Sequence, residues 1–141
     1  MTPRILLIED NEQNRYLATF LLEKNGFEVV CAQDGHQGIA LAAREQFDLV
    51  LLDILLPVMD GYAVAGELRR NPALQSVPII AVTSYAMVGD REKAMAAGCD
   101  GYIEKPINPD TFVAEISRFL RPSREGGSRG GNGILLPEGD S

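Results

Sequence analysis

The sequence has few of the features that mark a secreted or membrane-spanning protein. Its two cysteines, Cys31 and Cys99, are too few for a disulfide framework and too far apart for a zinc or redox motif. No apolar run approaches the roughly 18 residues of a membrane span. The N-terminus also lacks the pattern of a signal peptide. These absences predict a cytoplasmic protein without membrane contact.

Basic residues are scarce as well. The chain has 13 Lys and Arg against 20 Asp and Glu, which gives a net charge of -7. Because affinity for nucleic acid depends on neutralising phosphates with basic side chains, this balance argues against direct nucleic-acid binding. The single histidine, His36, lies near the start of a predicted helix, and we interpret it as a solvent-exposed residue.

A length of 141 residues suits one domain. The composition changes after residue 120, because residues 121–141 hold six of the 14 glycines and few large apolar side chains. We therefore predict a folded domain over residues 1–120 and a glycine-rich flexible tail over 121–141. The sequence leaves open whether this tail has a function.

Five short apolar runs recur along the chain at intervals of about 25 residues, a spacing typical of βα units. They cover residues 5–8, 29–32, 49–52, 79–82 and 102–103. The runs at 49–52 and 79–82 do not alternate with polar residues, which favours strands buried on both faces of a parallel sheet.

Helical patterns separate these runs. The first helix has Leu17, Phe20, Leu21 and Lys24 on one stripe and is expected to stop at Gly26, and the second is capped by Asp34. Val64 and Leu68 mark the third helix; Met87, Ala94 and Met95 mark the fourth, which ends at Gly98. The fifth helix is expected to begin at Asn108 and Pro109 and to have Phe112 and Ile116 on its apolar face. The strict alternation predicts an α/β fold with helices on both faces of the sheet.

Polar side chains follow four of the five predicted strands. They are Glu9 and Asp10 after the first, Asp53 after the third, Thr83 and Ser84 after the fourth, and Lys105 after the fifth. Since the carboxyl ends of parallel strands meet at one edge of a sheet, these groups are expected to converge there.

Together, the converging groups are suited to binding a cation and accepting a phosphoryl group. Three neighbouring carboxylates repel one another unless a cation joins them, and Mg²⁺ is the cation that prefers such oxygen ligands. A carboxylate beside Mg²⁺, a lysine and a hydroxyl can accept a phosphoryl group, because the cations neutralise charge on the transferred oxygens. An ionised aspartate is already a nucleophile and needs no general base.

The segments that carry these residues resemble the receiver domains of response regulators in two-component signalling. The matching segments are 8–12, 53–61, 82–84, 97–98 and 102–106, in the same order and spacing over residues 4–120. The resemblance implies a flavodoxin-like, doubly wound (βα)5 fold with strand order 2-1-3-4-5. It also implies a signalling domain and not an enzyme acting on other substrates.

The resemblance assigns the first part of the site. Asp53 is expected to accept the phosphoryl group from a histidine kinase or a histidine phosphotransfer protein. Asp10 and Asp53 are expected to bind Mg²⁺ directly, Glu9 through water, and the backbone carbonyl of Leu55 as a further ligand.

Other residues are assigned supporting roles in the same way. Thr83 is expected to bind the phosphoryl oxygens, Lys105 to pair with the phosphate, and the peptide bond before Pro106 to be cis. Gly61 is expected to permit a tight turn into the third helix. Tyr102 is expected to be a rotameric switch coupled to Thr83, with the fourth helix, fifth strand and fifth helix as the surface that binds a downstream protein target.

Two further positions set the lifetime of the phosphoryl group in this family, and here they hold Leu55 and Tyr85. Both are bulky, which predicts slow self-dephosphorylation. The sequence leaves open a stand-alone receiver or a piece of a larger regulator or hybrid kinase, and it leaves homodimer formation open. Two enzyme or cofactor folds fit poorly: a haloacid-dehalogenase phosphatase needs an Asp-x-Asp pattern after the first strand, and a flavodoxin needs a Ser/Thr-rich loop there.

Overall fold

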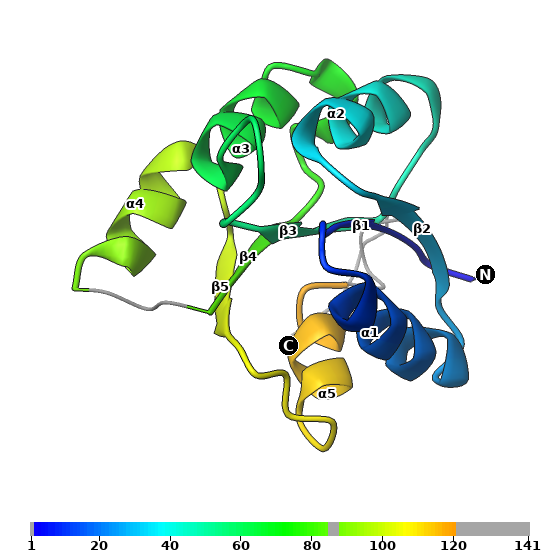
Figure 1. Cartoon of the computed structure of the whole chain (residues 1–141). Coiled ribbons are helices and arrows are strands. Elements are labelled where there is room, and N and C mark those ends of the chain that lie inside the picture. Colours follow the sequence, from blue (N-terminus) through cyan, green and yellow to red (C-terminus); the bar gives the residue numbers. More distant parts are fainter. Residues whose placement is uncertain (1, 85–87, 121–141) are drawn as a thin grey trace, which may run out of the picture.

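The computed structural model describes residues 2–84 and 88–120, which form one parallel sheet with helices on both faces (Figure 1). Its strands are β1 (Arg4–Ile8), β2 (Glu28–Ala32), β3 (Leu49–Asp53), β4 (Ile79–Thr83) and β5 (Gly101–Glu104). They lie in the order β2-β1-β3-β4-β5, and every neighbouring pair is parallel. The predicted fold class and strand order are confirmed.

In the described residues, four α-helices and one 3₁₀ turn connect the strands, and a fifth α-helix follows the last strand. They are α1 (Glu12–Lys24), α2 (Gly35–Arg44), α3 (Gly61–Arg69), the turn η1 (Pro72–Leu74), α4 (Asp90–Ala97) and α5 (Phe112–Ser117). Figure 1 shows α1 and α5 on one face of the sheet and α2, α3 and α4 on the other. None of the helices in the described part of the chain is long and apolar enough to cross a bilayer.

The core consists of two apolar layers, one on each face of the sheet. Along β3, Val50 and Leu52 pack into the layer under α2, α3 and α4, whereas Leu49 and Leu51 pack into the layer under α1 and α5. All residues of β3 and β4 are buried, so both faces of these central strands need apolar side chains. This double burial explains why their sequences do not alternate.

Several predicted helix boundaries are confirmed. Asp34 caps α2, where its Oδ1 accepts the N–H of Gln37 at 2.8 Å. Gly98 ends α4 with a φ of 113°, a left-handed conformation that favours glycine. Gly26 has a φ of 93° and follows Asn25, the C-cap residue of α1. Met87, which we placed on the fourth helix, lies outside the described residues.

Two helices differ from what the local sequence indicates. On the stripe of α1, Phe20 is 51% and Leu17 36% exposed and only Leu21 packs against the core, whereas Ala18 and Leu22 are buried. Apolar residues occur on two sides of this helix, so their spacing did not identify the packed side. The fifth helix begins later than predicted, because Asn108 does not cap it.

Asn108 closes a turn in front of α5. Its Oδ1 accepts the N–H of Asp110 at 2.9 Å, and its carbonyl accepts the N–H of Phe112 at 2.9 Å. The helix therefore begins only at Phe112. Phe112 and Ile116 form its buried face, as their spacing predicted.

Candidate functional site

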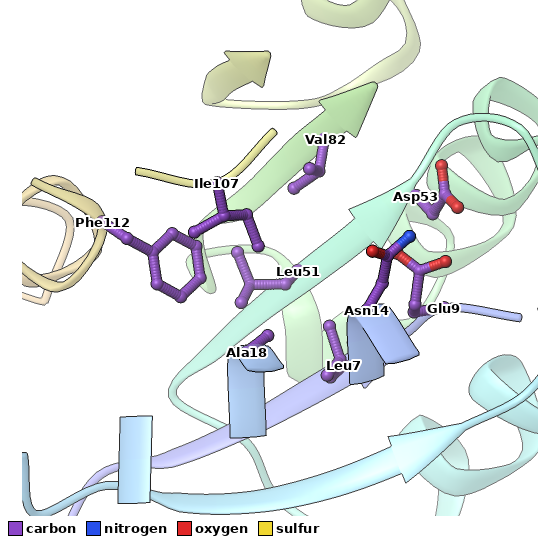
Figure 2. A pocket seen from close by; sticks show the side chains of 9 residues that line it. All are labelled: Leu7, Glu9, Asn14, Ala18, Leu51, Asp53, Val82, Ile107 and Phe112. Carbon is purple, nitrogen blue, oxygen red and sulfur yellow. The ribbon is translucent and has the colours of Figure 1, made fainter. Parts of the chain in front are cut away.

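Four polar side chains predicted to meet at the carboxyl edge of the sheet are brought there by the strand ends. Glu9 directly follows β1, Asp53 ends β3, Thr83 ends β4, and Lys105 directly follows β5. Glu9, Asp53 and Thr83 are at most 5% exposed, and such burial is unusual for the two acidic residues. Figure 2 shows Glu9 and Asp53 pointing toward the same region from neighbouring strands.

Lys105 joins the two buried carboxylates. Its Nζ lies 2.7 Å from Oε1 of Glu9 and 3.3 Å from Oδ2 of Asp53, and its side chain is only 9% exposed. Each carboxylate uses its other oxygen to accept a backbone N–H. Asn11 donates to Oε2 of Glu9 at 3.1 Å, and Leu55 donates to Oδ1 of Asp53 at 3.0 Å. Both carboxylates are therefore held in fixed orientations.

Asp10 completes an acidic cluster. One carboxylate oxygen from each of Glu9, Asp10 and Asp53 lies within 4.8 Å of the others, and Asp10 is the exposed member. Among the described residues, Lys105 places one ammonium group beside two of these three carboxylates, those of Glu9 and Asp53. A hard divalent cation fits such a set, because every acidic side chain offers oxygen donors and the negative charge exceeds the positive charge.

The buried position changes the acidity of Asp53. Burial raises the pKa of Asp53 from its ordinary value of 3.8 to about 7, and the adjacent Glu9 carboxylate adds to the rise. The Lys105 ammonium and the Leu55 N–H act in the opposite direction, since both stabilise the charged form. Asp53, coupled to Glu9, therefore takes up a proton more readily than an isolated aspartate does.

The loop after Asp53 makes a close turn that depends on Gly61. The N–H of Gly61 donates to the carbonyl of Ile54 at 2.9 Å. A side chain here would place its Cβ 2.5 Å from Cα of Ile54 and 2.7 Å from the carbonyl oxygen of Asp53. Gly61 is thus required for space. Within the same loop Val58 has a φ of 70°, a conformation that costs energy for a β-branched residue.

The remaining predicted residues surround this corner. The Lys105–Pro106 peptide bond is cis. Tyr102 is half-buried, and its hydroxyl finds no hydrogen-bond partner in the part of the chain that the structure describes. The Arg91 guanidinium carbon lies 5.2 Å from the centre of the Tyr102 ring. Tyr85, the second position expected to set the lifetime, lies outside the described residues.

Two residues of α1 belong to the site although sequence reasoning missed them. Asn14 lines a cavity of about 10 Å³ together with Glu9 and Asp53, as Figure 2 shows. Arg15 donates from Nη1 to the carbonyl oxygens of Glu9 at 2.9 Å and Asp10 at 3.0 Å. Both lie on the first turns of the helix after the acids, which is the only sequence signal that could have suggested them.

Comparisons with known proteins agree with this fold. Residues 5–117 match the response regulator receiver domain family. A curated relative is the polar-differentiation response regulator DivK of Brucella ovis, which is 38% identical over 120 residues, or 85% of this chain and 98% of that protein. The chain therefore belongs to the response regulator receiver domain family.

Two solved structures extend the comparison. The receiver domain of a sensor histidine kinase from Pseudomonas aeruginosa, with a magnesium ion coordinated in its active-site cleft, is 36% identical, with a TM-score of 0.79 over 85% of this chain and 98% of that one. A CheY-like receiver domain protein from Methanospirillum hungatei is 31% identical, with a TM-score of 0.82 over 90% of this chain and all of that one.

Proposed function

We propose that this receiver domain accepts a phosphoryl group on Asp53 from the phosphohistidine of a histidine kinase or a histidine phosphotransfer protein. An Asp53 carboxylate oxygen attacks the phosphorus, the P–N bond breaks, and the imidazole leaves with a proton from solvent. The observation that carries the proposal is the double ion pair, in which Lys105 holds Glu9 and Asp53 together at the edge of the sheet.

Three side chains support this transfer. The Lys105 ammonium lies beside the Asp53 oxygen and can pair with the added phosphoryl oxygens. Thr83, at the end of the neighbouring strand β4, is buried where its hydroxyl can donate to the same oxygens. Asp53 must be ionised to attack, and Lys105 favours that form.

We assign a Mg²⁺ site to Glu9, Asp10, Asp53 and the backbone carbonyl of Leu55. The carboxylates offer closely spaced oxygens with excess negative charge, which is the donor set that this ion prefers. When bound, Mg²⁺ supplies positive charge that neutralises the transferred phosphoryl oxygens. The Pseudomonas receiver domain with magnesium in its cleft supports this assignment by similarity.

We assign the output to altered protein contacts and not to catalysis on other substrates. Tyr102 stands on β5, and its buried hydroxyl, which has no partner among the described residues, makes an alternative side-chain position accessible at little cost. A new phosphate charge near Thr83 can bias that position. The surface of α4, β5 and α5 then binds a downstream protein target in the cytoplasm.

A stand-alone receiver and a receiver within a larger regulator or hybrid kinase share this chemistry. The curated DivK relative is covered almost completely by this chain, whereas the Pseudomonas structure is the receiver domain of a sensor histidine kinase. Both relatives support a role as a receiver in phosphoryl-transfer signalling. They differ only in what the phosphorylated domain is attached to.

The test is intact mass spectrometry of the chain after incubation with acetyl phosphate and Mg²⁺. We expect a gain of one phosphoryl mass that is absent in Asp53→Asn and absent when EDTA removes the metal. Asp110→Asn, an exposed loop change, is the matched control and should still gain the mass. Modification that persists in Asp53→Asn would show that another residue is the acceptor.

The decay of the same mass after removal of acetyl phosphate measures the lifetime. Leu55 is 49% exposed beside the acceptor, so its side chain can shield the acyl phosphate from water. We expect slow loss in the wild type and faster loss in Leu55→Asn. An equal decay in the two proteins would exclude shielding by Leu55.

A further inference from the structure

Arg15 folds back from α1 onto the loop that precedes the helix. A single nitrogen, Nη1, donates to the backbone carbonyls of both Glu9 and Asp10, at 2.9 Å and 3.0 Å. These are the two loop residues whose carboxylates face Asp53. The contact is therefore made to the backbone of the acidic residues and leaves their carboxylates available.

These two hydrogen bonds fix the direction of the acidic side chains. In a loop, a peptide group can rotate, and its rotation changes where the adjacent side chain points. The Arg15 contact holds the two successive carbonyls toward α1. The same loop is anchored at its other end by Asn11, whose Oδ1 accepts the N–H of Asn14 at 2.9 Å. The segment between β1 and α1 is thus held at both ends.

We propose that Arg15 is a positioning residue for the cation site, acting through the backbone carbonyls of Glu9 and Asp10. This inference rests on the proposed function, because it takes the three-carboxylate cluster to be a Mg²⁺ site. Groups that orient metal ligands without touching the metal commonly contribute about ten- to a hundredfold to affinity. We expect Arg15 to contribute about tenfold.

If Arg15 acted through its charge alone, its replacement would raise the affinity for Mg²⁺; if it acts by positioning the ligands, its replacement lowers that affinity. The guanidinium is positive, so its charge alone repels a nearby cation, and its removal would tighten Mg²⁺ binding. If Arg15 instead holds the ligands in place, its removal loosens the loop and weakens Mg²⁺ binding. The direction of the change therefore separates the two effects.

The experiment is a calorimetric titration of the full chain with Mg²⁺ at pH 8. Arg15→Met keeps the aliphatic stem but removes the donors and the charge, and we expect about tenfold weaker binding. Arg15→Lys keeps one donor group that can reach both carbonyls, so we expect most of the affinity to return. Arg70→Met is the control, since it removes the same charge from a 79% exposed side chain at the end of α3.

The outcomes distinguish this inference from the proposed function. A wild-type chain that binds no Mg²⁺ would overturn the proposed cation site itself. A wild type that binds, together with Arg15→Met binding equally or more tightly, would overturn only the role of Arg15. Thermal unfolding without Mg²⁺ shows whether each variant is folded. If Arg15→Met does not fold, Arg15→Gln takes its place in the same comparison.

Discussion

At Asp53, burial favours the protonated carboxyl group, whereas the proposed role as phosphoryl acceptor needs the ionised one. The sheet edge excludes water from its carboxyl group, yet an attack on phosphorus requires the ionised form. Burial raises the pKa of Asp53 to about 7, while Lys105 and the Leu55 N–H stabilise its charge. Electrostatic repulsion among the ionised carboxylates therefore destabilises the metal-free cluster, and a bound cation would relieve it.

This conflict predicts a pH-dependent stability of the metal-free chain. Because the folded chain binds the Asp53 proton more tightly than the unfolded chain does, protonation stabilises the fold. That contribution is complete below about pH 4 and is lost as the pH rises to about 7. Asp53→Asn removes the titrating group, so it should melt several degrees higher than the wild type at pH 8 in EDTA.

The comparison of the two proteins cancels the titrating groups that lie away from Asp53 and its partners Glu9 and Lys105. At pH 5, where Asp53 holds its proton, we expect the melting temperatures of the wild type and Asp53→Asn to lie close together. Thermal unfolding followed by circular dichroism at the two pH values measures both differences. A constant difference across this range would mean that the Asp53 pKa is not raised.

Among the elements, α3 begins unusually close to the end of β3. Gly61 is the first residue of α3, and the contact with the backbone of Ile54 leaves no room for a side chain. Since Ile54 follows Asp53, any shift that makes room also moves the proposed acceptor. At Gly66 in the same helix, by contrast, an added Cβ would meet no atom within 4 Å, so a methyl group fits there.

Alanine substitutions at these two glycines should have opposite effects on stability. Gly61→Ala should lower the free energy of unfolding by about 1–3 kcal/mol through overpacking, and it should slow phosphorylation by acetyl phosphate. Gly66→Ala should raise the free energy of unfolding by about 0.5–1 kcal/mol through helix propensity. Urea unfolding of both variants measures these changes, and a tolerated Gly61→Ala would contradict the close contact.

Helix α1 shows which features an apolar pattern predicts and which it does not. Its existence and its stop at Gly26 followed from local sequence, because capping and left-handed residues act within one turn. Its packed face did not, because Tyr16 and Phe20 form an outward stacked pair with ring centres 6.5 Å apart. The small Ala18 faces the sheet instead, because the packing between the helix and the sheet determines which face of α1 is buried.

Over the whole molecule, the edge opposite the proposed site is held by Arg69 at the end of α3. Its guanidinium donates to the carbonyls of Gly98, Leu74 and Val77 at 2.8, 2.6 and 2.8 Å, and it pairs with Asp100. These contacts join η1, the entry to β4 and the entry to β5. They lie at the amino ends of the strands, away from the acidic cluster.

Arg69 should therefore affect stability without affecting the cation site. Arg69→Met leaves three carbonyls without their donor, and we expect the free energy of unfolding to fall by about 2–4 kcal/mol. Mg²⁺ affinity, measured by calorimetry at a temperature where the variant is folded, should change by less than about twofold. Arg70→Met, its exposed neighbour, should change stability by no more than about 0.5 kcal/mol. A large loss of Mg²⁺ affinity in Arg69→Met would show that the two edges are coupled.

The sequence predicted the sheet and the acidic corner because both depend on regular features. Buried strands need continuous apolar runs, and parallel strands bring their carboxyl ends together, so Glu9, Asp53 and Lys105 could be expected to meet. Arg15 and Arg69 could not be found this way. Both act on backbone carbonyls, which every residue has, and their targets are defined only by how loops approach helices in the folded chain.

The site joins residues that are far apart in the sequence, since Lys105 reaches Glu9 across 96 positions. The complete set of Glu9, Asp53 and Lys105 assembles only when the first, third and fifth strands lie in one sheet. An unfolded or half-synthesised copy thus presents a lone aspartate with ordinary reactivity. Such copies would not divert phosphoryl groups from a donor, so the amount of signal would follow the number of folded molecules and not the number of chains.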